Sequence, residues 1–386
     1  MNTRRFQSPP RGFSLIELMI ALVLGLLVTG ALIQLFLANK LTYTVSDGLV
    51  RAQESARYAM ITVNRDLRMA GSQPICSGAP LDTRSLLRVD DDGDVGEVVA
   101  AGGFMGFDYN GTETGTYSFP LDGSGDASSG QWANFESTGL PPALVGRALA
   151  GTDVLAVAST VPVAGFTGCS SNNANANALN VCDQNDSSVD HPFDGGDIVT
   201  AVDCTAGVAD TFVNNTQGQG GGPEALTRAP GATGRGVRNI NAGSWSTAFR
   251  GQTEFYRTDV VYYFIGESAG STPQRFRPAL FRVRNCNDAD SCLFEELAEG
   301  VENLQVFFRR QGSDDLYSPR DNQIGDWANV TAAELDLVMV SPEPVENREL
   351  EQSLALGNGL TVQMEDRRIR VAYSHTAAVR NRIVVR

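Results

Sequence analysis

The sequence predicts an α+β fold in which a long N-terminal helix, membrane-spanning in its first half, packs on a mostly antiparallel β-sheet head with long loops. Three observations predict it. Residues 13–38 are almost entirely apolar, residues 39–70 are amphipathic, and the remainder alternates short β-rich runs with Gly, Asn, Asp and Ser. With 386 residues, of which 42% are hydrophobic, the chain is neither disordered nor wholly membrane-embedded.

The apolar run at the N-terminus is long enough to cross a membrane. At about 1.5 Å per residue, a helix over residues 13–38 exceeds the roughly 30 Å of a bilayer core. Arg4, Arg5 and Arg11 precede it, and basic residues before a span hold that end in the cytoplasm. We therefore expect the rest of the chain on the periplasmic side of the inner membrane. The run is too long for an ordinary secretory signal, although a plain anchor would share these features.

Glu17 is out of place within this run. An unpaired acid at the centre of a bilayer costs on the order of 3 kcal/mol on insertion scales, so such a residue needs a partner. Ala21, Gly25 and Thr29 follow it at four-residue intervals and form one stripe along the helix. Small residues at this spacing let helices approach closely in lipid, although chance placement in an apolar helix gives the same stripe.

The run Gly12-Phe13-Ser14-Leu15-Ile16-Glu17-Leu18 resembles the type III signal of the type IV pilin and pseudopilin superfamily. The resemblance implies that residues 1–12 are a leader, that prepilin peptidase cuts between Gly12 and Phe13, and that the new amine of Phe13 is methylated. It also implies that Glu17 neutralises the N-terminal amine of a neighbouring subunit, because two buried opposite charges are tolerable only as a pair. Major pilins of this class tend to carry proline where this chain has Gln34, which favours a minor pilin or pseudopilin.

Residues 39–70 continue the helix in amphipathic form. Apolar residues recur at three- and four-residue spacing, namely Leu49, Ala52, Ala56, Ala59, Val63 and Leu67, and Gly71 follows where a helix would be capped. We expect one helix over about residues 13–70, bent near Asp47-Gly48, with 13–38 in the membrane, 39–70 against the head, and 71–386 forming that periplasmic head. The end of this segment, residues 65–71, resembles the same region of PilW-like minor pilins.

The head is predicted to consist mainly of strands. Candidate strands are residues 153–159, 197–203, 259–265, 279–284, 304–309, 335–340 and 368–373, separated by loops that include 122–130, 170–180 and 217–236. The stretch 284–308, with its run Gly300-Val301-Glu302-Asn303-Leu304, and the tail 367–382 both resemble PilW. The pseudopilin J family of type II secretion shares the N-terminal features, but its members are generally shorter.

Six cysteines lie beyond the apolar run, where they would face the oxidising periplasm: Cys76, Cys169, Cys182, Cys204, Cys286 and Cys292. Their even number predicts structural disulfides, although their spacing does not select the pairs. The one pairing that we favour is Cys286 with Cys292, which would close a short hairpin, and the pairing of the other four stays open.

The sequence carries no recognisable catalytic or cofactor motif. The acidic run 90–94 fails the EF-hand pattern, which needs Gly at the sixth position and Glu at the twelfth, where this chain has Val95 and Ala101. His191 and His375 are its only histidines, and the cysteine spacing does not suit a zinc site. We therefore expect no enzymatic activity, no cofactor and no metal.

These observations favour a PilW-like minor pilin that primes type IV pilus assembly and sits at or near the pilus tip. The resemblance implies prepilin peptidase, other minor pilins, a PilY-type tip adhesin and the inner membrane as partners. A formal net charge of −15 argues against direct binding to nucleic acid. Two alternatives stay open: a J-type pseudopilin of a type II secretion tip complex, and a membrane-anchored periplasmic binding or hydrolytic protein in which Glu17 is incidental.

Overall fold

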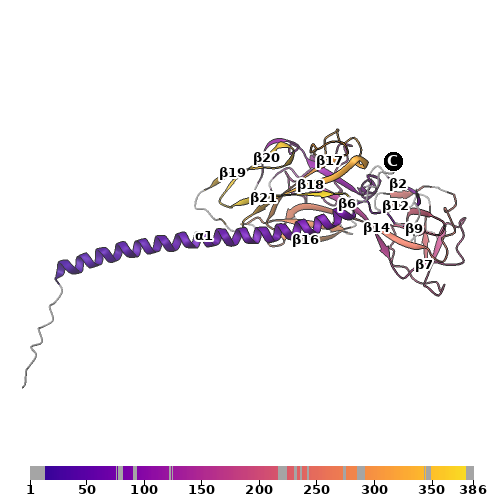
Figure 1. Ribbon diagram of the computed structural model, residues 1–386, viewed down its shortest axis with the longest axis horizontal. Helices are drawn as coiled ribbons and strands as arrows, with labels where there is room; N and C mark the ends of the chain where they lie inside the picture. The colour runs from indigo at the N-terminus through magenta and orange to yellow at the C-terminus, as the bar shows by residue number, and fades with distance from the viewer. Residues whose placement is uncertain are drawn as a thin grey trace, which may run out of the picture.

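The computed structural model of the chain shows a long helix that carries a strand-rich head on its second half (Figure 1). It describes residues 14–74, 76, 81–89, 94–120, 123, 125–215, 224–229, 233–234, 237–240, 243–272, 275–284, 292–342, 344 and 349–379.

The N-terminal helix α1 (Leu15–Met69) is a single helix, as predicted. Ser14 is its N-cap: the Ser14 hydroxyl accepts from the N–H of Glu17, and the Glu17 carboxylate accepts from the N–H of Ser14, which is a capping box. Ala70 is the C-cap, and Gly71 follows with a φ of +63°. A Cβ at Gly71 would lie 2.4 Å from the carbonyl oxygen of Gly102, so this turn requires glycine.

Within the described residues, the head is built on a nine-stranded sheet of order β1-β10-β9-β14-β6-β3-β5, with β15 and β16 added beside β14. Its strands are β1 (Asp82–Ser85), β3 (Phe104–Tyr109), β5 (Trp132–Ala133), β6 (Val154–Val163), β9 (Ile198–Asp203), β10 (Val208–Val213), β14 (Glu254–Glu267), β15 (Pro278–Arg284) and β16 (Leu293–Glu299). The first part of β14 pairs with β9 and its second part with β15, while β6 pairs along its other edge. Only β1 and β10 run parallel in this sheet of the described chain.

Four three-stranded sheets complete the same part of the chain. They are β17 (Val301–Arg310), β18 (Val330–Val340) and β21 (Arg370–Ala378); β4 (Gly115–Ser118), β19 (Leu350–Ala355) and β20 (Leu360–Asp366); β7 (Thr167–Gly168), β8 (Ala178–Cys182) and β11 (Ala225–Thr227); and β2 (Leu87–Val89), β12 (Thr233–Gly234) and β13 (Val237–Asn239). A short helix, α2 (Asp94–Ala100), and the 3-10 turns η1 (Ser129–Gln131), η2 (Trp327–Asn329) and η3 (Gly357–Gly359) lie between them. The predicted α+β class is confirmed, and the seven predicted strands correspond to β6, β9, β14, β15, β17, β18 and β21.

The second half of α1 forms part of the larger hydrophobic core. Its buried residues are Gly48, Ala52, Ala56, Ala59, Val63 and Leu67, and the helix contacts β6, β16, β18 and β21. A second core contains Phe212, Trp245, Phe249 and Phe255. It lies at the N-terminal end of β14, which extends past the C-terminal end of α1 (Figure 1). The head is therefore attached along α1 and also continues beyond it.

Asp153 joins the nine-stranded sheet to the β17–β18–β21 sheet. Its N–H donates to the carbonyl of Leu304 (2.8 Å), and its carboxylate accepts from the N–H groups of Val306 (2.9 Å) and Tyr109 (3.2 Å). The Asp108 carboxyl group is buried close enough to Asp153 for its charge to oppose the ionisation of Asp153. Burial disfavours the charged forms, so it raises the pKa of Asp108 to about 7 and holds that of Asp153 well above its usual range.

A buried ionic network connects the start of β17 with the end of β20 and the start of β21. The guanidinium of Arg370 donates to both carboxylate oxygens of Glu302 (2.5 and 3.0 Å) and to both of Asp366 (2.6 and 3.0 Å), and Arg368 donates to Asp366 (2.7 Å). Arg370 and Glu302 are almost completely buried. Burial alone would raise the pKa of Asp366, but the hydrogen bonds from the two arginines outweigh it and lower that pKa to about 2.

Replacing Arg370 with methionine should destabilise the head strongly. The variant leaves the buried Glu302 carboxylate with only Arg368, 3.4 Å away, as a cation, and breaking a buried pair in this way costs about 3–5 kcal/mol. Urea unfolding of the detergent-solubilised chain, followed by the fluorescence of buried Trp132 and Trp327, measures the loss. The double variant Arg370→Met, Glu302→Gln should recover part of it. A loss below about 1 kcal/mol for Arg370→Met would show that the network does not hold the strands together.

The Asp108–Asp153 pair should make the head less stable as the pH rises. The folded protein keeps a proton that the unfolded chain releases above its ordinary pKa near 3.8, so the free energy of unfolding should fall between about pH 4 and pH 7. Asp108→Asn removes the buried carboxyl and the like charge beside Asp153, so it should flatten this dependence and stabilise the protein at pH 8 by up to a few kcal/mol.

Urea midpoints measured from pH 4 to pH 8 test this expectation. Glu351→Gln is the matched control, because it changes an exposed carboxylate of β19 to an amide in the same way. Identical pH profiles for the unmodified chain and Asp108→Asn would contradict a raised pKa of Asp108.

Candidate assembly interface

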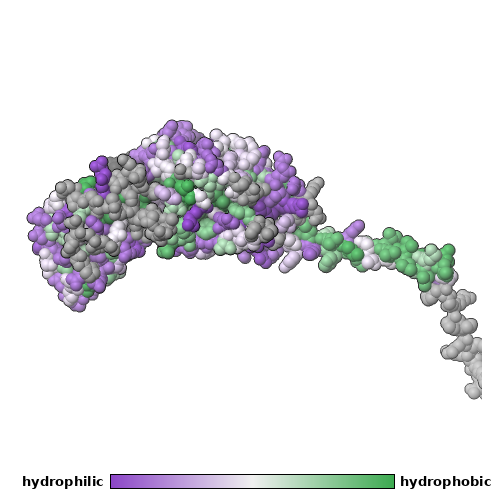
Figure 2. Space-filling model, turned by 180° about the vertical axis from the view of Figure 1, so that it is seen from behind, coloured by the Kyte–Doolittle hydropathy of each residue, from purple (hydrophilic) through white to green (hydrophobic). Residues whose placement is uncertain are grey.

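The two halves of α1 have opposite surroundings. The first half contains an 18-residue window of mean hydropathy 2.5, and none of that window is buried. Figure 2 shows this half as an apolar rod that projects from the head. The second half carries the buried residues that pack on the head. An apolar helix that the head leaves uncovered must be covered by lipid or by other proteins.

Glu17 and the small residues after it lie on this uncovered half. Glu17, Ala21, Gly25 and Thr29 are all exposed. Glu17 makes no ion pair within the part of the chain that the structure describes. A Cβ at Gly25 would meet nothing within 4 Å, so no contact within the described chain requires glycine there. The Thr29 hydroxyl donates to the carbonyl of Gly25 (2.8 Å), which leaves the helix surface without a protruding donor. The Glu17, Ala21, Gly25, Thr29 stripe is thus accessible to a second helix.

The predicted processing site lies outside the described residues. Gly12 and Phe13 both precede Ser14, the first described residue. Cleavage between them, and methylation of the new amine, stay predictions from the sequence.

A polar network fixes the second half of α1 to the nine-stranded sheet. The Tyr263 hydroxyl on β14 donates to the carboxylate of Asp66 (2.6 Å), and the Arg282 guanidinium on β15 lies 3.7 Å from the same carboxylate. Arg282 also donates to Glu295 on β16 (2.6 and 3.0 Å). Burial and the neighbouring Asp66 charge both raise the pKa of Tyr263, which keeps the hydroxyl a donor.

Sequence reasoning did not identify this network. The only available signal was the position of Asp66, which directly precedes the buried Leu67 in the helix. Its partners lie about 200 residues further along the chain, as the sequence separation of 197 between Asp66 and Tyr263 shows.

The disulfides lie in the head, and they connect Cys76 with Cys204 and Cys169 with Cys182. The spacing had left these pairs open. Cys292 is also disulfide-bonded, whereas Cys286, its predicted partner, lies outside the described residues.

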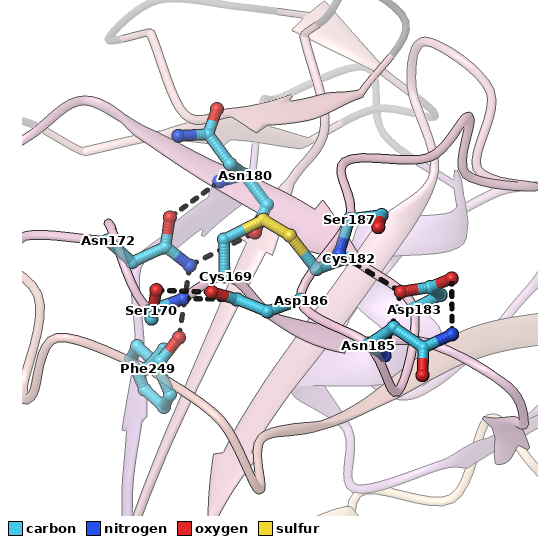
Figure 3. The surroundings of a disulfide bond; sticks show 10 residues. All are labelled: Cys169, Ser170, Asn172, Asn180, Cys182, Asp183, Asn185, Asp186, Ser187 and Phe249. Carbon is cyan, nitrogen blue, oxygen red and sulfur yellow. Dashed lines mark hydrogen bonds between the residues drawn. A yellow bond between two sulfur atoms is a disulfide. The ribbon is translucent and has the colours of Figure 1, made fainter.

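The Cys169–Cys182 bridge closes a loop that side chains reinforce (Figure 3). The Asn172 amide donates to the carbonyls of Asn180 and Phe249 (3.0 Å each), and its oxygen accepts from the N–H of Asn180 (2.8 Å). The sulfur atoms and a carboxylate oxygen of Asp186 lie within 4.8 Å of one another. Because the disulfide removes both thiolates, this group is a structural bridge rather than a thiolate metal site.

Two ranges of the chain match models of known protein families. Residues 262–381 match the family model described as type IV pilus-assembly protein W, PilW. Residues 8–33 match the prokaryotic N-terminal methylation motif. No curated protein and no solved structure matches the chain.

The matched ranges coincide with the features described above. The first contains Tyr263, Arg282 and the Glu302–Arg370 pair, which attach α1 and hold the head strands together. The second contains Glu17 and the stripe that follows it. The sequence segments 284–308 and 367–382, which suggested this family, belong to or overlap the first range.

Proposed function

We propose that this chain, a PilW-like type IV minor pilin, primes the assembly of a type IV pilus and takes up a position at or near its tip. The observation that carries the proposal is the uncovered first half of α1 with Glu17 on it. A membrane helix with an unpaired acid suits a subunit that leaves the bilayer for a bundle of helices.

The mechanism has three steps. Prepilin peptidase removes residues 1–12 at the cytoplasmic side of the inner membrane, and the amine of Phe13 is methylated. The apolar half of α1 then leaves the bilayer and packs among other pilin helices along the Ala21, Gly25, Thr29 stripe. Glu17 pairs with the N-terminal amine of a neighbouring subunit and so sets the axial position of the helix.

The shape of the head supports a terminal position. The second core extends past the C-terminal end of α1 (Figure 1), so it occupies space along the helix axis that a further subunit in a shaft would need. At the tip this space is free for other minor pilins and for a PilY-type adhesin. The role is structural, and we propose no catalytic activity for it.

Glu17→Ala should be processed and inserted normally but should assemble poorly. The variant removes the acid that would meet a neighbouring amine, while it leaves the apolar helix and the head intact. Pili counted by electron microscopy should fall several-fold, and mass spectrometry of the membrane fraction should still show the mature N-terminus. Glu351→Ala, which removes an exposed acid from β19 of the head, is the control. Unchanged pilus numbers in Glu17→Ala would refute the proposed pairing.

Replacing Gly12 by a larger residue should leave the 12-residue leader attached. A bulkier side chain at the position before the cut should prevent cleavage by the peptidase. The mass of the protein from the membrane fraction decides the matter directly. Gly30→Ala is the control, because a Cβ at Gly30 would meet nothing within 4 Å. A mature chain that begins at Phe13 in the Gly12 variant would disprove the assigned cleavage site.

A further inference from the structure

Large apolar side chains lie on the side of α1 that faces away from the head. The buried residues from Gly48 to Leu67 define the side that meets the head. At about 100° per residue, Tyr43, Val50 and Ile61 lie on the opposite side. They are 73%, 51% and 58% exposed, and Tyr58 beside them is 54% exposed. We call these four residues, with the charged residues between them, the outward face of α1.

The charges on the outward face are mainly positive. Arg57, Arg65 and Arg68 lie on its C-terminal part, whereas the two acids of this face, Asp47 and Glu54, both precede Arg57. Arg57 makes no ion pair within the described residues, and the Arg65 side chain is 66% exposed although it forms an ion pair with Asp66 (3.3 Å). The chain as a whole carries a formal charge of −15, so this basic face contrasts with the rest of the molecule.

The membrane restricts which helix can pack against this face. Two chains anchored by their N-terminal helices stand parallel and at the same height, because both apolar runs lie in the bilayer. A second copy of this chain would therefore bring its three arginines opposite the same three arginines. Like charges at the same height disfavour that pairing, as in coiled coils that select partners by charge.

We propose that the outward face of α1 binds the amphipathic helix of a different membrane-anchored subunit, which runs parallel to α1 and is acidic at the height of Arg57, Arg65 and Arg68. Tyr43, Val50, Tyr58 and Ile61 form the apolar centre of the contact, and the arginines exclude a second copy of this chain. Such a partner would be one of the subunits that this chain meets in the proposed function, on which this proposal rests because both chains must be anchored in the membrane.

A charge-reversed copy of this chain can serve as the acidic probe. Ile61→Cys is introduced into two differently tagged copies, one of which also carries Arg57→Glu, Arg65→Glu and Arg68→Glu. After co-expression, isolated membranes are treated with a short bismaleimide, and cross-linked dimers are quantified by tag. The mixed pair should cross-link at least threefold more than either like pair. The excess should shrink in 0.5 M salt, which shortens the electrostatic screening length to about 4 Å.

Gln53→Cys is the matched control position, because it is exposed but lies about 80° around the helix from Ile61. Cross-linking there should be weak and independent of the charge reversal. Equal yields for all three pairings at Ile61→Cys would overturn the proposal.

A neutral variant keeps the test valid if the reversed copy does not fold. Copies with Arg57→Gln, Arg65→Gln and Arg68→Gln should cross-link with each other at Ile61→Cys at least twofold more than unmodified copies do, because their mutual repulsion is removed. Equal yields would again overturn the proposal. Since the assay needs no pili, its failure is distinguishable from that of the proposed function, which the pilus count of Glu17→Ala tests.

Discussion

The structure depends on a change of surroundings halfway along one helix. From Gly48 to Leu67, α1 is buried at every third or fourth residue against the head, whereas no residue of the apolar window before it is buried. The two halves belong to one rigid element without a break. Whatever covers the first half is therefore mechanically connected to the head, and a displacement of one must displace the other.

That connection is only as firm as the attachment of the second half. Its buried side chains are mostly alanines, which lose little rotamer freedom on burial but also contribute little buried area each. The Asp66–Tyr263–Arg282 network adds directional contacts to this smooth surface, and Asp153 and Arg370 in turn tie the sheets beneath it together. The head thus combines a close-packed but shallow helix interface with a few buried polar contacts that fix its position. Each contact joins segments that are distant in sequence.

The separation of these partners along the sequence explains which features the sequence could predict. The helix, its terminal glycine and seven of the strands follow from local patterns, because periodicity and turn residues act within a few positions. The stripe from Glu17 to Thr29 is likewise local. In contrast, the Cys76–Cys204 bridge has a sequence separation of 128, and the Asp108–Asp153 pair depends on how β3, β6 and β17 come together. Local patterns contain no information on such contacts, so the pairs could be recognised only in three dimensions. Predicted strands such as 259–265 were also too short, because β14 continues through the polar residues Arg257 and Thr258.

The division of α1 also constrains how the chain can enter an assembly. Moving an exposed apolar side chain such as Leu24 or Leu27 from an apolar environment into water costs up to about 1.5–3 kcal/mol, so a subunit cannot leave the membrane before other helices are in place to receive it. In the proposed function, the outward face of the second half of α1 lies outside the bilayer from the start, and a partner can reach it while the apolar half is still in lipid. Contacts at that face can therefore form first and align the apolar halves. Extraction then exchanges lipid for protein without exposing the helix to water.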